Sequence, residues 1–175
     1  MKASDLFIKC LEEEGVTKIF GIPGEENADF MISLKKSKKI EFILCRHEQA
    51  AAFMADVYGR LTGKAGVCLA TLGPGVTNLM TGLADANMDR APVVAIIGQG
   101  STNRLHKESH QIMDSISMVA PISKWAQTIL SSKNITEVVR KAFKVAETEK
   151  PGVTVIELPE DIAKEEIKDQ PIKPT

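Results

Sequence analysis

The chain has 175 residues, which is enough for one domain with a sizeable hydrophobic core. Hydrophobic residues make up 43% of it and charged residues 26%, proportions that are ordinary for a globular protein. The net charge of −1 gives no electrostatic attraction for nucleic acid or for an anionic membrane surface, so we expect neither partner.

Three cysteines, Cys10, Cys45 and Cys68, show no CxxC spacing. Cys45 and Cys68 lie in apolar runs, where a free cysteine behaves as a small hydrophobic residue. This usage is typical of a reducing compartment and predicts a cytoplasmic location. The N-terminal residues do not form a secretory signal pattern, and no apolar run approaches the roughly 20 residues that span a bilayer.

Helices and strands are predicted to alternate along the chain. Ser4 is expected to cap a first helix, which ends near Glu14 because Gly15 follows. Further helices are expected at 28–36, 48–61, 76–86 and 135–147, and strands at 18–20, 41–45, 66–71, 93–97, 124–129 and 153–158.

This alternation predicts a three-layer α/β/α fold with a mostly parallel sheet of about six strands. Ligands of such sheets bind at the carboxyl ends of the strands. Four polar or glycine-rich segments follow strands and should share that rim, at 21–24, 46–48, 73–75 and 98–100. We expect the domain to cover residues 1–160, and the charged, proline-bearing segment 161–175 to be a linker to further domains.

The common nucleotide and metal motifs are incomplete in this sequence. Gly98-Gln99-Gly100 lacks the third glycine of a dinucleotide fingerprint, and residues 59–64 are one residue short of a P-loop and lack its Ser/Thr. His106 and His110 are four residues apart, but they form no HExxH motif and have no evident third ligand, so no metal site is predicted.

Two features of the rim could carry chemistry. The Gly73-Pro74-Gly75 turn would let a ligand approach the backbone and the N–H groups of the following helix, although a plain strand-to-helix turn would look the same. Glu48 opens a helix, where the helix dipole favours any carboxylate. The residues alone leave both readings open.

A resemblance to a known family decides between them. The segments that carry it occur in the order FGIPGEE, RHEQAAAFMADVYGRLTGKAGV, LGPGVTNLMTGLADA, RAPVVAIIGQ, HQIMD, APISKW, AETEKPG and VIELPEDI. Together they resemble the N-terminal pyrimidine-binding domain of thiamine-diphosphate-dependent enzymes, most of all that of acetolactate synthase large subunits. The resemblance extends over nearly the whole chain.

The resemblance implies roles for particular residues. It implies that Glu48 hydrogen-bonds N1′ of the cofactor's aminopyrimidine, and that Gln111 reaches the reacting centre. The residues that it implies around the pyrimidine are Ile22, Pro23, Gly24, Thr71, Pro74 and Asn78. The implied reaction joins two pyruvates into 2-acetolactate with loss of CO2. Alternatives are another 2-oxoacid decarboxylase or carboligase of the family, or a non-catalytic assembly module.

The resemblance also implies parts that lie outside this sequence. Enzymes of this family bind the cofactor's diphosphate through Mg²⁺ with a GDG…N motif in a later domain, and this sequence contains no GDG. We therefore expect the chain on its own to be inactive, whether it is an excised domain or a separate subunit. FAD is compatible with the family, but HQxMD resembles the catabolic, flavin-independent members.

The implied partners follow from the same family. A homodimer or tetramer is expected to form through this domain, with Ala51, Ala52, Ala55 and Tyr58 of one helix packing against the second copy, or else only against their own sheet. A regulatory small subunit is possible in this family. His110 and Leu72 depart from the family's usual phenylalanine and serine, which leaves the substrate open but not the cofactor. Branched-chain amino acid biosynthesis and the acetoin pathway are both compatible with the resemblance.

Overall fold

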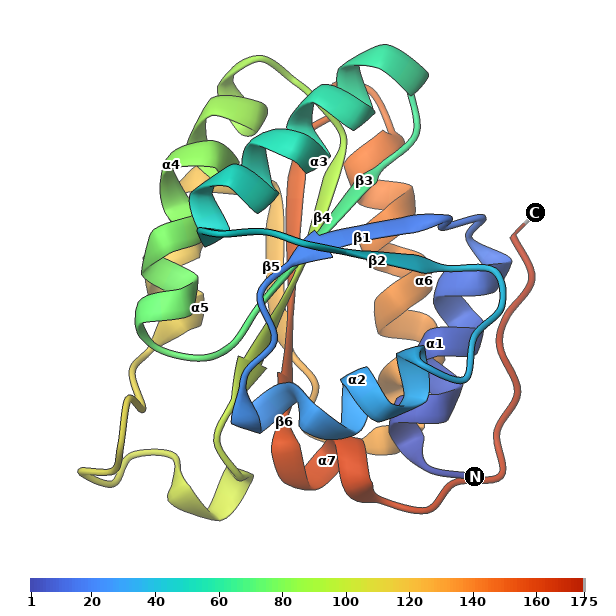
Figure 1. Cartoon of the computed structure of the whole chain (residues 1–175), viewed down its shortest axis with the longest axis vertical. Helices are drawn as coiled ribbons and strands as arrows, with labels where there is room; N and C mark the ends of the chain where they lie inside the picture. Colours follow the sequence, from blue (N-terminus) through green and yellow to red (C-terminus); the bar gives the residue numbers. More distant parts are fainter. Residues whose placement is uncertain (175) are drawn as a thin grey trace.

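A computed structural model describes residues 1–174 as a six-stranded sheet between two layers of helices (Figure 1). The strands are β1 (Lys18–Gly21), β2 (Glu41–Leu44), β3 (Gly66–Ala70), β4 (Val93–Gln99), β5 (Trp125–Thr128) and β6 (Val153–Pro159). The helices are α1 (Ala3–Glu13), α2 (Ala28–Leu34), α3 (Glu48–Thr62), α4 (Pro74–Met88), α5 (Ser115–Val119), α6 (Ile135–Glu147) and α7 (Glu160–Lys164). The predicted three-layer α/β/α fold is confirmed.

All strand pairs in the sheet are parallel, in the order β2-β1-β3-β4-β6-β5. From β1 the chain moves outward to β2, then returns past β1 to β3 and continues in the other direction. The strand order therefore reverses between β1 and β3. Parallel sheets bind ligands beside such a reversal, at the carboxyl ends of the strands.

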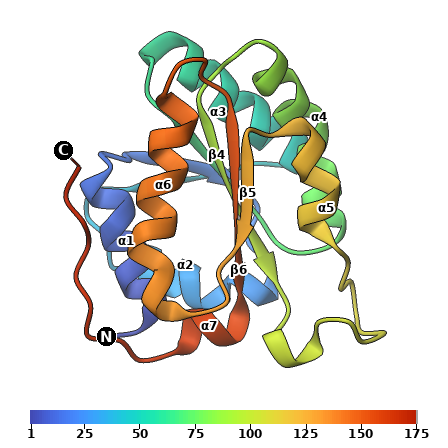
Figure 2. The same ribbon diagram turned by 180° about the vertical axis from the view of Figure 1, so that it is seen from behind.

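The helices divide between the two faces of the sheet (Figures 1 and 2). Helices α1, α2, α6 and α7 pack on one face, and α3, α4 and α5 lie on the other. Strands β3, β4 and β6 are buried along their whole length because both faces are covered.

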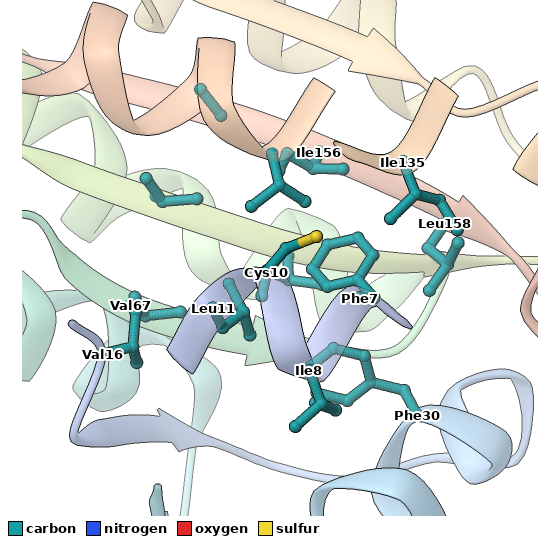
Figure 3. Close-up of a cluster of buried hydrophobic side chains, with 14 of the residues drawn as sticks. Phe7, Ile8, Cys10, Leu11, Val16, Phe30, Val67, Ile135, Ile156 and Leu158 are labelled. Atoms are coloured by element: carbon teal, nitrogen blue, oxygen red, sulfur yellow. The ribbon is translucent and has the colours of Figure 1, made fainter. Parts of the chain in front are cut away.

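The first core forms where α1 crosses the sheet. Its apolar residues recur at helical spacing. Phe7 and Cys10 point toward β6 and α6, and Leu11 lies beside Val67 of β3 (Figure 3). Phe7 also meets Phe30 of α2 edge to face, with ring centroids 5.5 Å apart.

The second core joins α3, α4 and the sheet through small residues. Ala51, Ala52 and Ala55 are fully buried within the domain. A Cβ on Gly82 of α4 would lie only 2.6 Å from Cβ of Ala52, so the two helices are in close contact. The three alanines therefore pack within their own domain. This was one of the two predicted alternatives, the other being contact with a second copy.

Two helix starts differ from the sequence-based prediction. Ser4 is not the cap of α1, which begins at Ala3; it is buried, and its hydroxyl accepts a hydrogen bond from Ser33 at 2.9 Å. Asp5 instead caps the helix by accepting from the backbone N–H of Lys2. Helix α4 starts at Pro74 rather than near residue 76, because proline needs no N–H partner and its fixed φ suits a first helical turn.

The segment expected to be a linker begins by packing on the domain. Ile162 and Ala163 of α7 and Ile167 beyond it are buried, and Ile167 exchanges backbone hydrogen bonds with Met1. The domain boundary at residue 160 remains a prediction, and Thr175, the last residue of the expected linker, lies outside the described residues. No helix within residues 1–174 is both long enough and apolar enough to cross a membrane.

Candidate functional site

The candidate site lies at the carboxyl ends of β1 and β3. Gly24, in the loop after β1, packs directly on Thr71, the residue that follows β3; a Cβ at residue 24 would collide with the threonine side chain. The backbone N–H of Ile22 donates to the carbonyl of Leu69 in β3 at 3.3 Å. These contacts bring the 22–24 loop and the end of β3 together on the predicted rim.

Glu48 occupies the first position of α3 at this rim. His47 caps the helix, since its Nδ1 accepts the backbone N–H of Gln49 at 3.1 Å. The side chains of Arg46 and His47 point to solvent, whereas Glu48 is only 9% exposed. Local capping therefore turns the carboxylate of Glu48 inward and its two polar neighbours outward.

The carboxylate of Glu48 is oriented by α4. Asn78 donates from Nδ2 to Glu48 Oε2 at 2.9 Å. The other oxygen, Oε1, lies beside Gly75, where an added Cβ would be 3.6 Å away. Glu48 forms no ion pair with Arg46 in the part of the chain that the structure describes. Glu48 is therefore a buried carboxylate with one oxygen fixed and the other next to a position that carries no side chain.

A second carboxylate that the sequence analysis did not assign lies at the same rim. Thr71 donates from Oγ1 to Glu26 Oε2 at 3.0 Å. A Cβ on Gly98, at the end of β4, would be 3.6 Å from Cβ of Glu26. The only signal in the sequence was the place of Glu26 inside the FGIPGEE segment, two residues after Gly24.

Gln111 approaches the site from the long loop between β4 and α5. A Cβ on Gly73 would lie 2.8 Å from the carbonyl oxygen of Gln111 and 2.9 Å from its Cβ, so the loop rests on the Gly73–Pro74 turn. Gly73 has φ 57 and ψ −120, a conformation that glycine adopts most easily. A depression of about 280 Å³ beside this contact is lined by Pro74, Thr77, Gln111, Ile112 and Met113.

No role was predicted from the sequence for two buried polar residues at the base of this loop. Gln99 at the end of β4 and Glu157 of β6 are 2% and 3% exposed, and Gln99 Nε2 donates to Glu157 Oε1 at 3.0 Å. Burial raises the pKa of Glu157, while hydrogen bonds from Thr128 and Gln99 oppose that rise. Gln99 lies between Gly98 and Gly100 in a segment expected at the rim, but no pattern linked it to Glu157, whose neighbours Ile156 and Leu158 are apolar.

The two histidines considered as metal ligands, His106 and His110, are exposed in the same loop. In the part of the chain that the structure describes, no group of three or more His, Cys, Asp or Glu side chains could hold a metal ion.

The residues expected around a pyrimidine ring thus all lie at one rim. Pro23 and Pro74 are exposed, Ile22, Gly24, Thr71 and Asn78 are half-buried, and Glu48 is buried between them. Contacts join Gly24 to Thr71, Asn78 to Glu48 and Gln111 to Gly73. The roles of these residues remain a proposal.

Comparison with known families agrees with this geometry. Residues 1–118 match the family model described as "Thiamine pyrophosphate enzyme, N-terminal TPP binding domain". The chain belongs to this family. Thiamine pyrophosphate is the same compound as thiamine diphosphate, so the family assignment supports the cofactor expected from the resemblance.

Three curated relatives resemble nearly the whole of this chain. "Acetolactate synthase" of Bacillus subtilis is 42% identical over 164 residues, which cover 94% of this chain and 29% of the relative. "Probable acetolactate synthase large subunit" of Methanocaldococcus jannaschii is 44% identical over 167 residues, or 95% of this chain and 28% of the relative. "Acetolactate synthase, catabolic" of Raoultella terrigena is 45% identical over 159 residues, or 91% and 28%. The chain therefore spans less than a third of the length of these relatives.

Proposed function

We propose that this chain is the pyrimidine-binding part of a thiamine-diphosphate-dependent carboligase that makes 2-acetolactate and CO2 from two pyruvates. The observation that carries the proposal is Glu48, a buried carboxylate oriented by Asn78 at the strand-order reversal. The three relatives, all of which carry the name acetolactate synthase, support the choice of reaction.

When bound, thiamine diphosphate supplies a carbon that adds to the keto group of a 2-oxoacid and a ring that accepts the electrons left as CO2 departs. Glu48 holds a proton between its carboxylate and N1′ of the aminopyrimidine. Asn78 fixes the direction of that carboxylate through its 2.9 Å hydrogen bond, and Gly75 lies next to its second oxygen. The remaining pocket residues, Ile22, Pro23, Gly24, Thr71 and Pro74, surround the pyrimidine. Gln111 faces the reacting molecules from the loop above Gly73.

The other half of the active site belongs to parts of the protein beyond this chain. We propose that a later domain binds the diphosphate through Mg²⁺, and that the isolated chain is inactive and binds the cofactor only weakly. A cytoplasmic location agrees with three free, buried cysteines. FAD and a regulatory small subunit are further features of the family that the full-length protein could carry.

We also propose that the domain contributes to a homodimer through the outer face of α3. The apolar side chains Met54, Val57 and Leu61 lie three and four residues apart on this helix and are 43%, 49% and 81% exposed. Met88 at the end of α4 is also exposed, at 79%. A row of exposed apolar side chains on one helix face favours contact with a second protein chain.

The test of the catalytic proposal is Glu48→Gln in the full-length protein. The substitution keeps the shape of the side chain but removes its ability to take up a proton. We expect kcat for pyruvate consumption to fall about 100-fold or more, as for loss of a general acid–base group. Product analysis for 2-acetolactate distinguishes this reaction from that of another 2-oxoacid decarboxylase.

A matched control is Glu137→Gln, which removes another glutamate from the first turn of a helix, α6. It should leave turnover within about twofold of the wild type, because it changes only helix-dipole stabilisation and a hydrogen bond from Thr136. Near-normal turnover of the Glu48 variant would overturn the proposal and favour a non-catalytic assembly role.

A further inference from the structure

The loop that carries Gln111 is tied to the sheet at both of its ends by a single side chain. Gln99, the last residue of β4, accepts the backbone N–H of Gly100 through Oε1 at 2.9 Å. Its Nε2 donates to the carbonyl oxygen of Met113 at 3.2 Å. Gly100 begins the loop and Met113 lies two residues after Gln111, so Gln99 closes the loop at its base. The loop projects from the carboxyl end of the sheet, at the lower left of Figure 1.

Glu157 determines how the amide of Gln99 is turned. Its Oε1 accepts from Gln99 Nε2 at 3.0 Å, and its Oε2 accepts from Thr128 Oγ1 at 2.6 Å. A carboxylate only accepts hydrogen bonds, so it requires the NH₂ group of Gln99 to face it. The NH₂ group then also reaches Met113, and the amide oxygen is left for Gly100.

The outer part of the loop has separate ties. Arg104 binds the hydroxyl of Ser109 through Nε at 3.1 Å and Nη2 at 2.9 Å, and Asp161 of α7 accepts from the backbone N–H of Thr102 at 3.0 Å. These contacts hold residues 102–109 together, and the backbone N–H of Ile112 donates to the carbonyl of Ser109 at 3.2 Å across the turn that contains Gln111. Gln99 holds the other side of that turn at Met113, so the approach of Gln111 to Gly73 also depends on the base of the loop.

We propose that Gln99 and Glu157 are positioning residues, which hold the 100–114 loop so that Gln111 lies over the Gly73–Pro74 turn. The inference rests on the proposed function, in which Gln111 faces the reacting molecules. Neither residue touches the cofactor or substrate; both act through the backbone of the loop. Because Gln99 and Glu157 are almost fully buried, solvent does not compete for these hydrogen bonds.

The first variant is Gln99→Leu, which removes both ties while retaining a side chain of similar size. In the full-length protein, we expect faster hydrogen exchange at the backbone amides of residues 103–113 and a fall in kcat of about tenfold to a hundredfold, the effect of a displaced active-site group. The matched control is Thr154→Val on β6. It removes one fully buried hydrogen bond, from Thr154 Oγ1 to Ala142, and leaves the loop untouched.

A double variant, Gln99→Glu with Glu157→Gln, separates positioning from simple stability. The exchanged pair can still bond, because the new amide at residue 157 would donate to the new carboxylate at residue 99. That carboxylate can also still accept the backbone N–H of Gly100, but it has no hydrogen to donate to Met113. We expect the thermal midpoint to return toward that of the wild type, while loop exchange stays fast and kcat stays low.

The outcomes distinguish the positioning role of Gln99 and Glu157 from the proposed role of Gln111 in the reaction. Recovery of kcat together with stability in the double variant, or unchanged loop exchange in Gln99→Leu, would overturn the positioning role. Fast loop exchange with unchanged kcat would instead show that Gln111 has no part in the reaction, and would overturn that element of the proposed function. If kcat falls as much in Thr154→Val as in Gln99→Leu, general destabilisation explains both losses, and the positioning role is overturned.

Discussion

Glu48 illustrates why a residue's local position does not identify its function. The helix dipole favours any carboxylate in the first turn of α3. If the side chain of Glu48 were exposed to solvent, this effect would be enough to explain its position. Its burial and the hydrogen bond from Asn78, which comes from another helix, require more than capping. A buried carboxylate that is fixed through one oxygen, with the other beside a glycine, is suited to exchanging a proton with a bound ring.

Glu157 gives a prediction at the same scale, for the dependence of stability on pH. Burial raises its pKa in the folded state, so the folded chain holds this proton at pH values where the unfolded chain has released it. The stability that this proton contributes is complete below the unfolded pKa, and it is lost as pH rises toward the folded pKa. Ionisation at higher pH therefore lowers the free energy of unfolding of the wild type.

Glu157→Gln removes this titration but retains hydrogen-bonding groups for Thr128 and Gln99. Its free energy of unfolding, relative to the wild type, should rise with pH from about pH 4 upward, by up to about 1.4 kcal/mol per pH unit. Denaturant unfolding of both chains across the acid range measures the difference. A constant difference between the two chains would show that Glu157 has the same pKa folded and unfolded.

Several polar contacts of the rim could not be predicted from the sequence because they join distant positions. Thr71 and Glu26 are 45 residues apart, and Gln99 and Glu157 are 58 apart. Neither pair has a spacing that a local pattern could reveal. The residues expected around the pyrimidine were located by the family resemblance, which supplied a set of positions before any contact between them was known.

At the scale of the elements, strands and helices were predictable because their apolar residues recur at periods of about two and 3.6. The continuous apolar run of β4 also indicated a strand covered on both faces. The prediction was wrong at Ser4, where burial against Ser33 took the place of capping. It did not specify α5, since five residues are too few for a helical period to appear.

Arg60 provides a test of how α3 is fixed to α4. Its guanidinium binds both oxygens of Asp56, at 2.7 and 2.8 Å, and also contacts Asp85 and Asp89 near the end of α4. The side chain of Asp56 is 2% exposed, so loss of Arg60 would leave a buried charge without its partner.

We expect Arg60→Met to lower the free energy of unfolding by about 2 kcal/mol, because it leaves Asp56 unpaired. The loss is smaller than that for a fully buried ion pair, because Arg60 itself is partly solvated. Adding Asp56→Asn should restore part of the loss by removing the unpaired charge. Lys18→Met breaks the exposed pair with Glu41 and should cost less than about 1 kcal/mol. Equal losses in Arg60→Met and Lys18→Met, measured by denaturant unfolding, would contradict this account of the α3–α4 contact.

At the scale of the whole molecule, the outer face of α3 is where a second copy is proposed to bind. Val57→Glu would place a charge in the middle of this apolar face without disturbing the buried face of the helix. We expect the full-length protein to dissociate to smaller species, as measured by analytical ultracentrifugation. Ile32→Glu is the control, because Ile32 is 55% exposed on α2, at the opposite face of the sheet. Dissociation by Ile32→Glu but not by Val57→Glu would place the interface elsewhere.

The whole molecule presents half of a proposed active site at one rim of the sheet. The reversal of strand order between β1 and β3 brings the Gly24 loop, Glu48 and the Gly73–Pro74 turn together, and the buried base of the 100–114 loop supports Gln111 above them. The fold class followed from the alternation of helices and strands, whereas the orientation of each polar group depended on contacts across the sheet.

The central claim is that Glu48 handles the proton at N1′ of the bound cofactor, and proton exchange at the cofactor's reactive C2 carbon tests it most directly. The measurement is the rate at which that proton is replaced by deuterium in the full-length protein loaded with thiamine diphosphate and Mg²⁺. We predict a rate at least about 100-fold lower in Glu48→Gln than in the wild type, with Glu137→Gln unchanged. Equal exchange rates in the wild type and Glu48→Gln would contradict the account.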